Sequence, residues 1–210
     1  MATATTASTG MEPIYLPDVE NNPQPSPYFD LIKAVKASPE GGQEYWQIWH
    51  LLAFRPEMTI HLGRFTHAVM YEPGPIPPSL RELIATYTSS LNQCQFCMRS
   101  HAAVTAQLLN DPAVVQAVID NLETASIPEN EKALLRFVRK VTLESYTITR
   151  EDMPPLYEQG WDDAAIYYAI TVSALFNFYN RWINSTGVHP VSAENHALHA
   201  AKIAARGYVR

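Results

Sequence analysis

The sequence predicts an all-α protein, and three observations lead to that class. Along most of the chain, apolar residues recur at intervals of three and four, as they do on one face of a helix. No segment of useful length alternates apolar and polar residues, as a half-buried strand would. Prolines and capping residues divide the periodic stretches into pieces of helical length. With 210 residues, 47% of them hydrophobic, the chain can bury one core, so we expect a single domain over residues 28–210.

Residues 1–27 differ from the rest in composition. They are rich in Thr, Ala, Ser, Asn and Pro and contain few apolar side chains. Burial of so little apolar surface cannot offset the entropy lost on ordering. We therefore expect a mostly flexible N-terminal tail that ends at residue 27.

The charge pattern argues against nucleic acid and membrane partners. The formal net charge is -6, and the lysines and arginines are scattered, so no basic surface for nucleic acid is expected. No window approaches about 18 consecutive apolar residues, and the first residues lack the basic and apolar regions of a secretory signal. We expect a soluble, cytoplasmic protein that does not bind membranes.

Three helices are expected between residues 28 and 72. The first carries Phe29, Ile32 and Val35 on one face. A second segment repeats that spacing with Tyr45, Ile48, Trp49 and Leu52. Pro56 interrupts the pattern, and a third helix is expected from Glu57 to about Tyr71.

The segment EPGPIPPS cannot continue a helix, and a new helix is expected directly after it. Ser79 is a candidate N-cap, with Glu82 three residues later in a capping-box pattern. The core-facing stripe that follows consists of Leu80, Leu83, Ile84, Tyr87 and Leu91. Because Glu82 lies about 150° from the centre of that stripe, the pattern alone favours a solvated capping glutamate.

The helices of the second half follow from similar signals. The tripeptide LNQ ends the previous run, and a helix is expected from Cys94 to Leu109. NDP supplies a cap and a first-turn proline for a short helix over residues 114–122. IPENEKALLRFVRKVTLES is acidic at its start and basic towards its end, as the helix dipole favours. Thr149 caps another short helix, which terminates at Gly160.

The segment DDAAIYYAITVSALFNFYNRWIN is hydrophobic on nearly all sides, which predicts a central helix buried by its neighbours. Arg181 lies in this helix, and a buried charge needs a partner such as Glu82 or Glu144. A last helix is expected from about Ser192 to Arg206.

The stretch CQFCMRSH contains both cysteines of the chain. At about 100° per residue, Cys94, Cys97 and His101 fall within roughly 60° on one helix face. The first turn of a helix favours a thiolate, and CxxC spacing lets two sulfurs reach disulfide distance. His101 can accept a thiol proton, so the pattern favours redox chemistry at an activated thiol.

Two other interpretations of the cysteines stay open. A closed zinc site needs four ligands, whereas CxxCxxxH supplies three, so the fourth would come from Glu82, His67 or His50. The second alternative is a pair of buried core cysteines without chemistry.

Other histidines and aromatic residues have ordinary structural explanations. His196 and His199 form an HxxH pattern for which a solvated or capping role is favoured over metal binding. His50, His61 and His67 are expected to be partly buried, and one of them is a candidate for lining the thiol pocket. Core or subunit interface is favoured over a ligand box for Trp46, Trp49, Phe176, Phe178, Tyr179 and Trp182.

Glu82 lies twelve positions before Cys94, so the chain contains the pattern Ex11CxxCxxxH. This pattern resembles the alkylhydroperoxidase AhpD family within the carboxymuconolactone decarboxylase-like superfamily. The likeness to its peroxidase-related branch includes RPE at 55–57, LRELIATYTSSLNQCQFCMRSHA, LLRFVRKVTLESYTITREDM, LYEQGWDD and FNFYNRW, and covers roughly residues 55–187.

The resemblance implies an AhpD-like all-α fold, with the CxxC at a helix start, and an enzyme that reduces organic hydroperoxides without a bound cofactor. Carried over, Cys97 would be the attacking thiol, Cys94 the proton donor and resolving thiol, and Glu82 with His101 the proton relay. A lipoyl-type or thioredoxin-type dithiol protein would then reduce the disulfide. We also expect a homo-oligomer that buries part of the aromatic surface.

The sequence differs from the family at one position of the motif, and two alternative functions stay open. The best-studied branch resembles CxHC, whereas Phe96 stands at that position here, so a second proton carrier is missing. The first rival is an acid-base enzyme of the carboxymuconolactone decarboxylase type, against which the intact CxxC argues. The second is a non-enzymatic redox adaptor or sensor whose dithiol serves a partner protein.

Overall fold

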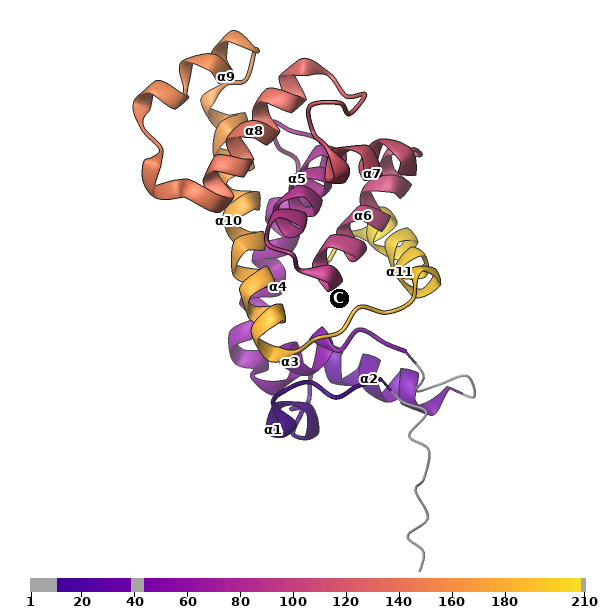
Figure 1. Cartoon of the computed structure of the whole chain (residues 1–210). Helices are drawn as coiled ribbons and strands as arrows, with labels where there is room; N and C mark the ends of the chain where they lie inside the picture. The colour runs from indigo at the N-terminus through magenta and orange to yellow at the C-terminus, as the bar shows by residue number, and fades with distance from the viewer. Residues whose placement is uncertain (1–10, 39–43, 209–210) are drawn as a thin grey trace, which may run out of the picture.

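The computed structural model describes residues 11–38 and 44–208, and in those residues it contains helices joined by turns, without strands (Figure 1). The longer helices are α2 (Pro27–Ala37), α4 (Pro56–Tyr71), α5 (Pro78–Leu91), α6 (Gln95–Leu109), α8 (Glu129–Glu144), α10 (Asp163–Thr186) and α11 (Ala193–Arg206). The shorter elements are α1 (Pro17–Asn21), α3 (Ile48–Phe54), α7 (Pro112–Asp120), α9 (Pro154–Glu158) and the 3₁₀ turns Ser145–Thr147 and Arg150–Asp152. The predicted all-α class is confirmed.

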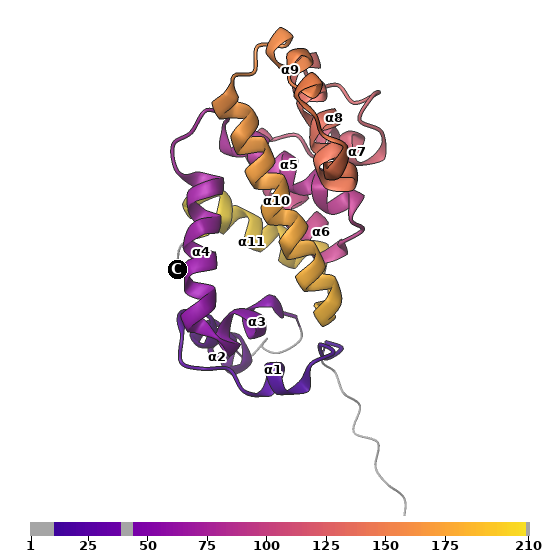
Figure 2. The same ribbon diagram turned by 90° about the vertical axis from the view of Figure 1, so that its left-hand side faces the viewer.

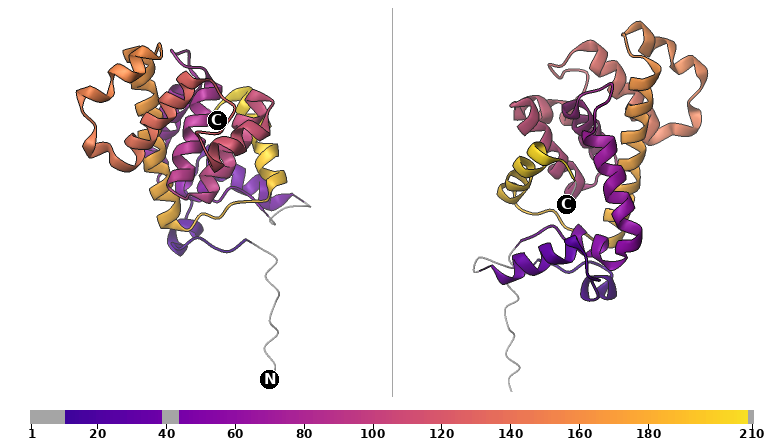
Figure 3. Two further views of the ribbon diagram at one scale, coloured as in Figure 1. Left: turned by 45° about the horizontal axis from the view of Figure 1, so that its top comes forward. Right: turned by 180° about the vertical axis from the view of Figure 1, so that it is seen from behind.

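The pair α5 and α6 forms the centre of the molecule. α10 packs against α5, α8 and α4, while α11 packs along α6 (Figure 3). Helices α1 to α3 lie together at one end of the molecule, and α7 to α9 lie towards the other (Figures 1 and 2). Within the described ranges, no helix is long and apolar enough to cross a membrane.

Proline and short polar side chains set most helix starts. Proline stands in the first turn of α1, α2, α4, α5, α7 and α9, where its missing N–H costs no helical bond. Ser26, Asp111, Asp162 and Ser192 each accept a hydrogen bond from a first-turn backbone N–H. The predicted helix starts near these residues are therefore correct to within one or two positions.

The capping box predicted at Ser79 and Glu82 is wrong. α5 begins at Pro78, so Pro77 occupies the cap position and makes no side-chain cap. Ser79 consequently lies inside the first turn. Glu82 is fully buried and bonded to another helix, which periodicity could not reveal because α5 is covered on nearly all sides.

Part of the segment 11–27, for which a mostly flexible tail was expected, contacts the rest of the molecule. Ile14 is 2% exposed, and the Tyr15 N–H donates to the carbonyl of Thr186 at 2.9 Å. The Tyr15 ring covers Gly187, where φ is +74° and a side chain would collide with the ring. A few well-placed apolar residues thus order a segment whose average composition is polar. Residues 1–10 lie outside the described residues.

α10 is buried along most of its length but has one exposed side. Tyr167, Ile170 and Phe178 are 66%, 36% and 49% exposed, so the prediction that neighbours bury the whole helix is wrong on this side. Arg181 lies at the same surface, where its guanidinium donates to the backbone and side-chain oxygens of Asn177. A carboxylate partner for Arg181 is therefore not needed, because the charge remains in solvent.

Candidate functional site

The two cysteines lie at the start of α6. Cys94 occupies the N-cap position and Cys97 the first turn, and both are buried free thiols. Gln93 precedes them with φ of +54°, a left-handed conformation that turns the chain sharply between α5 and α6. The Cys94 N–H then donates to the carbonyl of Ser89 at 3.0 Å. The sharp turn fixes the thiol pair against α5.

The surroundings shift the pKa values of the two thiols in opposite directions. A hydrogen bond from Cys97, aided by the amide of Asn180, lowers the pKa of Cys94. Burial, together with the neighbouring Cys94 sulfur, raises the pKa of Cys97. In the reduced pair the negative charge is therefore favoured on Cys94, with Cys97 as the protonated donor.

Glu82 and His101 form a buried pair beside the thiols. Nδ1 of His101 lies 2.7 Å from Oε2 of Glu82, although the two residues come from different helices. The carboxylate is fully buried and the histidine is 8% exposed. The edge of Phe176 packs against the imidazole with ring centroids 4.3 Å apart. A carboxylate on Nδ1 fixes the proton there and leaves Nε2 as the basic nitrogen.

Tyr208 completes this group and was not predicted from the sequence. Its hydroxyl donates to Oε1 of Glu82 at 2.9 Å and lies 3.1 Å from Nδ1 of His101. Burial, and then the charge of Glu82, raise the pKa of Tyr208 well above its ordinary value, so the hydroxyl keeps its proton. No sequence signal links residue 208 to residues 82 and 101, because only the path of α11 brings them together.

Asn180 is the second unpredicted residue. It is fully buried on α10, donates to Oγ of Ser89 at 2.9 Å and accepts from Nδ2 of Asn92 at 3.0 Å. Its side chain also reaches the thiols. It lies in FNFYNRW, the segment that supported the family resemblance, and an amide in so apolar a stretch was the available signal.

A partly open cavity of about 80 Å³ adjoins these residues. Cys97 and His101 line it, whereas Cys94 does not. The remaining walls are mainly aromatic and aliphatic, and include Trp46, Trp49, Phe96, Val104, Phe176 and Ile203, with Thr66, Ser100, Tyr179 and Tyr208 as polar groups. Trp46, Trp49, Phe176 and Tyr179 are thus core residues, as expected, that also form a pocket wall.

The other histidines lie outside the cavity wall. His196 is 2% exposed and its Nδ1 lies 3.2 Å from Oγ of Ser100, so the predicted solvated or capping role is wrong for it. His199 packs on Trp46 with ring centroids 4.5 Å apart. His50, His61 and His67 do not line the cavity, so the expectation that one of them does is also wrong.

The open question of a metal site has a structural answer for part of the chain. Among the described residues, no group of three or more His, Cys, Asp and Glu side chains is arranged to hold a metal ion. All three suggested fourth ligands have other partners. Glu82 is bonded to His101 and Tyr208, His50 lies 2.8 Å from the hydroxyl of Tyr45, and Nδ1 of His67 accepts from the Tyr208 N–H at 3.2 Å.

Comparison with known proteins finds a matching family and solved structures of similar fold. The carboxymuconolactone decarboxylase family matches residues 56–140, a range that contains Glu82, Cys94, Cys97 and His101. A peroxidase-related protein with the AhpD core from Ralstonia eutropha JMP134 is 27% identical, with 83% of this chain and 90% of that chain covered and a TM-score of 0.71. A peroxidase-related protein from Silicibacter sp. TM1040 is 25% identical, with 91% and 98% covered and a TM-score of 0.75.

The debrominase Bmp8 is 17% identical, with 82% of this chain and 90% of that chain covered and a TM-score of 0.64, which shows a shared fold alone. No curated protein matches the sequence. Residues 56–140 therefore match the carboxymuconolactone decarboxylase family, and the fold of the chain is similar to that of AhpD-like, peroxidase-related proteins.

Proposed function

We propose that this protein is a cysteine-based peroxidase that reduces organic hydroperoxides through the Cys94–Cys97 pair. The observation that carries the proposal is one arrangement: Cys97 and His101 share an apolar cavity, while Cys94 lies behind Cys97. A substrate in the cavity would meet one thiol and one imidazole, and the second thiol would stand ready to resolve the product. The peroxidase-related names of two structural relatives support the same reaction class.

The first step oxidises Cys97. Because burial raises the pKa of Cys97, this thiol needs a base to react: Nε2 of His101, held by Glu82 through Nδ1, takes its proton. The thiolate attacks the terminal peroxide oxygen, the O–O bond breaks, and the electron pair leaves on the alkoxide. Protonated His101 then returns the proton to the alkoxide, which leaves as an alcohol. Cys97 has become a sulfenic acid, and the peroxide has accepted two electrons.

The second step closes a disulfide. The Cys94 thiolate attacks the Cys97 sulfur, an S–S bond forms, and hydroxide leaves and takes a proton from solvent to become water. The lowered pKa of Cys94 suits it to this step. Because its pKa is lowered, Cys94 is less often protonated, so we assign the role of proton donor in the first step to His101. A lipoyl-type or thioredoxin-type dithiol protein would return the two electrons, which suits a reducing, cytoplasmic compartment.

The cavity favours neutral, apolar hydroperoxides. Its lining is mainly aromatic and aliphatic, and among the residues that the structure describes it includes no lysine or arginine. A carboxylated peroxide would have to bury its charge without a cation, which is costly. An aryl or alkyl hydroperoxide gains burial of its apolar body against these walls. The missing imidazole at Phe96 makes the wall still more apolar.

The proposal is tested by single-turnover mixing of the fully reduced protein with cumene hydroperoxide. We expect loss of two titratable thiols per equivalent of peroxide, faster than for free cysteine at the same pH. Cys97→Ser should abolish this reaction, whereas Cys94→Ser should stop at a sulfenic acid that dimedone traps on Cys97. Thiols that react no faster than free cysteine would instead support the adaptor or sensor role. Turnover of a lactone acid without thiol involvement would support the acid-base role.

A further inference from the structure

We propose that Tyr208 is a positioning residue of this site: its hydroxyl holds the Glu82 carboxylate, and through it the orientation of His101. The inference rests on the proposed function, because it assigns the proton-transfer role to His101. It adds a residue that lies outside the CxxCxxxH pattern and outside the matched family segment of residues 56–140.

The hydrogen bonds divide the carboxylate between two partners. Oε2 of Glu82 faces Nδ1 of His101 at 2.7 Å, and Oε1 accepts from the Tyr208 hydroxyl at 2.9 Å. The same hydroxyl lies 3.1 Å from Nδ1 of His101, so the three groups form a closed triangle. A rotation of the carboxylate would break both of its bonds, which restricts Glu82 to one orientation.

The hydrogen bond from Tyr208 to Glu82 is important because the carboxylate is buried. Glu82 is fully buried, and a buried carboxylate is costly unless its oxygens accept hydrogen bonds. Tyr71 also lies nearby, since burial and the Glu82 charge raise its pKa. Because the Tyr208 hydroxyl is a neutral donor, it holds the carboxylate without adding a cation that would compete with His101 for it. The negative charge can then stabilise His101 when the imidazole takes up a proton.

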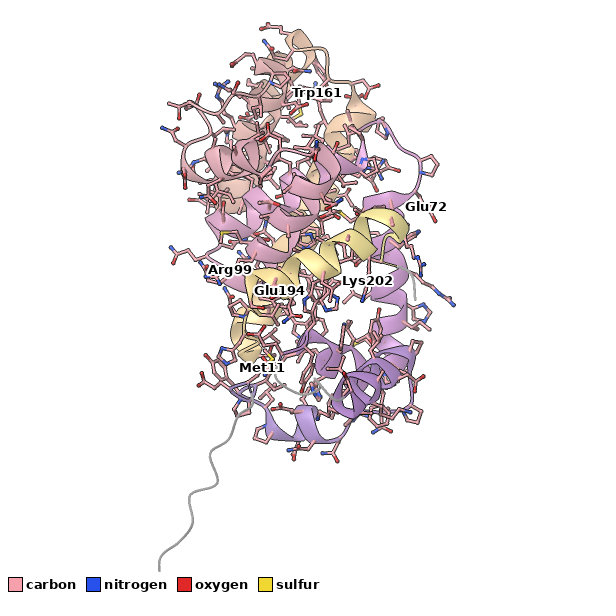
Figure 4. The ribbon with its side chains drawn as sticks, turned by 90° about the vertical axis from the view of Figure 1, so that its right-hand side faces the viewer. Met11, Glu72, Arg99, Trp161, Glu194 and Lys202 are labelled. Atoms are coloured by element: carbon pink, nitrogen blue, oxygen red, sulfur yellow. The ribbon has the colours of Figure 1, made fainter. Side chains whose placement is uncertain are left out.

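Local chain geometry delivers Tyr208 to this position. α11 crosses the face of the molecule, with Glu194 near its start and Lys202 further along it (Figure 4). It ends at Gly207, where φ is +67° and a Cβ would lie 2.7 Å from the His67 ring. The Tyr208 N–H then donates to Nδ1 of His67 at 3.2 Å. The turn sends the tyrosine ring inward between α4 and α6.

A merely structural role for Tyr208 is the competing explanation. Its ring lines the site cavity and also the neighbouring cavity near Pro56 and Arg64, so it is a wall between them. A wall needs the ring but not the hydroxyl. Tyr208→Phe keeps the ring and removes the hydroxyl, so it distinguishes the structural role from the positioning role.

The experiment measures iodoacetamide alkylation of Cys97 against pH in a Cys94→Ser background. We expect Tyr208→Phe to move the alkylation profile to higher pH and to slow alkylation at pH 7 roughly tenfold, the usual effect of one lost hydrogen bond to a charged group. The matched control is Tyr45→Phe, which removes another buried tyrosine–histidine bond, to His50, away from the cavity. The control should leave the profile unchanged, and circular dichroism should show both variants folded.

Coupling to Glu82 gives a second readout. If Tyr208 acts through the carboxylate, Tyr208→Phe should slow alkylation little further once Glu82→Gln is present. A wild-type profile for Tyr208→Phe, or effects of the two substitutions that simply multiply, would overturn the proposal. Alkylation does not require peroxide turnover. A protein inert to cumene hydroperoxide, but with a Tyr208-dependent profile, would therefore disprove the proposed function and retain Tyr208 as a positioning residue.

Discussion

Two buried histidines outside the group formed by Glu82, His101 and Tyr208 link stability to pH. Burial, with a contribution from Lys36, lowers the pKa of His50 to about 4. Burial, with a contribution from Arg99, lowers the pKa of His196 to about 4. Both imidazoles are therefore neutral in the folded protein near neutral pH, whereas in the unfolded chain they titrate at their ordinary value near 6.5.

We predict that acidification destabilises the fold between about pH 6.5 and about pH 4. In that window the unfolded chain binds protons that the folded protein does not, so the free energy of unfolding falls as the pH falls, by up to ~1.4 kcal/mol per pH unit for each histidine. Urea denaturation at pH 7 and pH 5 measures this. His196→Gln should reduce the pH dependence, and the exposed His61→Gln should not. Equal unfolding free energies at the two pH values would contradict the prediction.

For individual residues, the sequence revealed only part of the candidate site. Cys94, Cys97 and His101 share one helix, so spacing alone brought them together. Glu82 lies on another helix, and its own periodicity pointed to solvent; only the family resemblance suggested its role. Tyr208 could not be predicted, and an amide in an apolar stretch was the available signal for Asn180, because the contacts of both residues depend on how α11 and α10 cross α5 and α6.

Arg81 joins two helices beside the site. Its guanidinium is 1% exposed and donates to the carbonyls of Val69, Glu72 and Ile76 at 3.1, 2.7 and 2.8 Å. It also lies 4.9 Å from the centre of the Tyr168 ring. These bonds tie the end of α4 and the following loop to the start of α5, one residue before Glu82.

We predict that Arg81→Met destabilises the protein by roughly 2–4 kcal/mol, because three carbonyls lose their donor in a largely buried place. Chemical denaturation of the variant measures the change. Arg150→Met, at an exposed arginine, should change the unfolding free energy by about 0.5 kcal/mol or less. Similar effects of the two substitutions would mean that the Arg81 hydrogen bonds contribute little.

The positions of the helices along the chain were easier to predict than the faces that they bury. Capping residues and prolines act within one turn, so the starts of α7, α10 and α11 were correct within one or two residues. Burial depends on which faces meet other helices. The exposed side of α10 and the covered side of α5 were therefore both misjudged from apolar patterning.

On the scale of the whole molecule, α10 presents an apolar stripe to the outside. Tyr167, Ile170 and Phe178 follow helical spacing, and no described helix lies in front of α10 in Figure 2. Asp163 lies at one end of the stripe and Arg181 at the other. Two copies paired antiparallel about a two-fold axis would bring these opposite charges together around the apolar residues.

We predict a homo-oligomer in which this stripe is an interface between copies. Sedimentation should give a mass at least twice the 23.6 kDa of one chain. Ile170→Glu combined with Phe178→Glu should shift it towards a single chain, because buried charges would face each other. Tyr146→Glu alters an apolar residue that is 88% exposed but lies off the stripe, and should leave the mass unchanged. A wild-type mass of one chain would contradict the expectation.

The inward turn at Gly207 has a practical consequence for anyone preparing the protein. Tyr208 is the last described residue and reaches the buried carboxylate of Glu82. Bulk inserted directly after Tyr208 would lie next to that contact, and kinetics recorded with such an insertion would include its effect. A purification tag should therefore be placed away from residue 208.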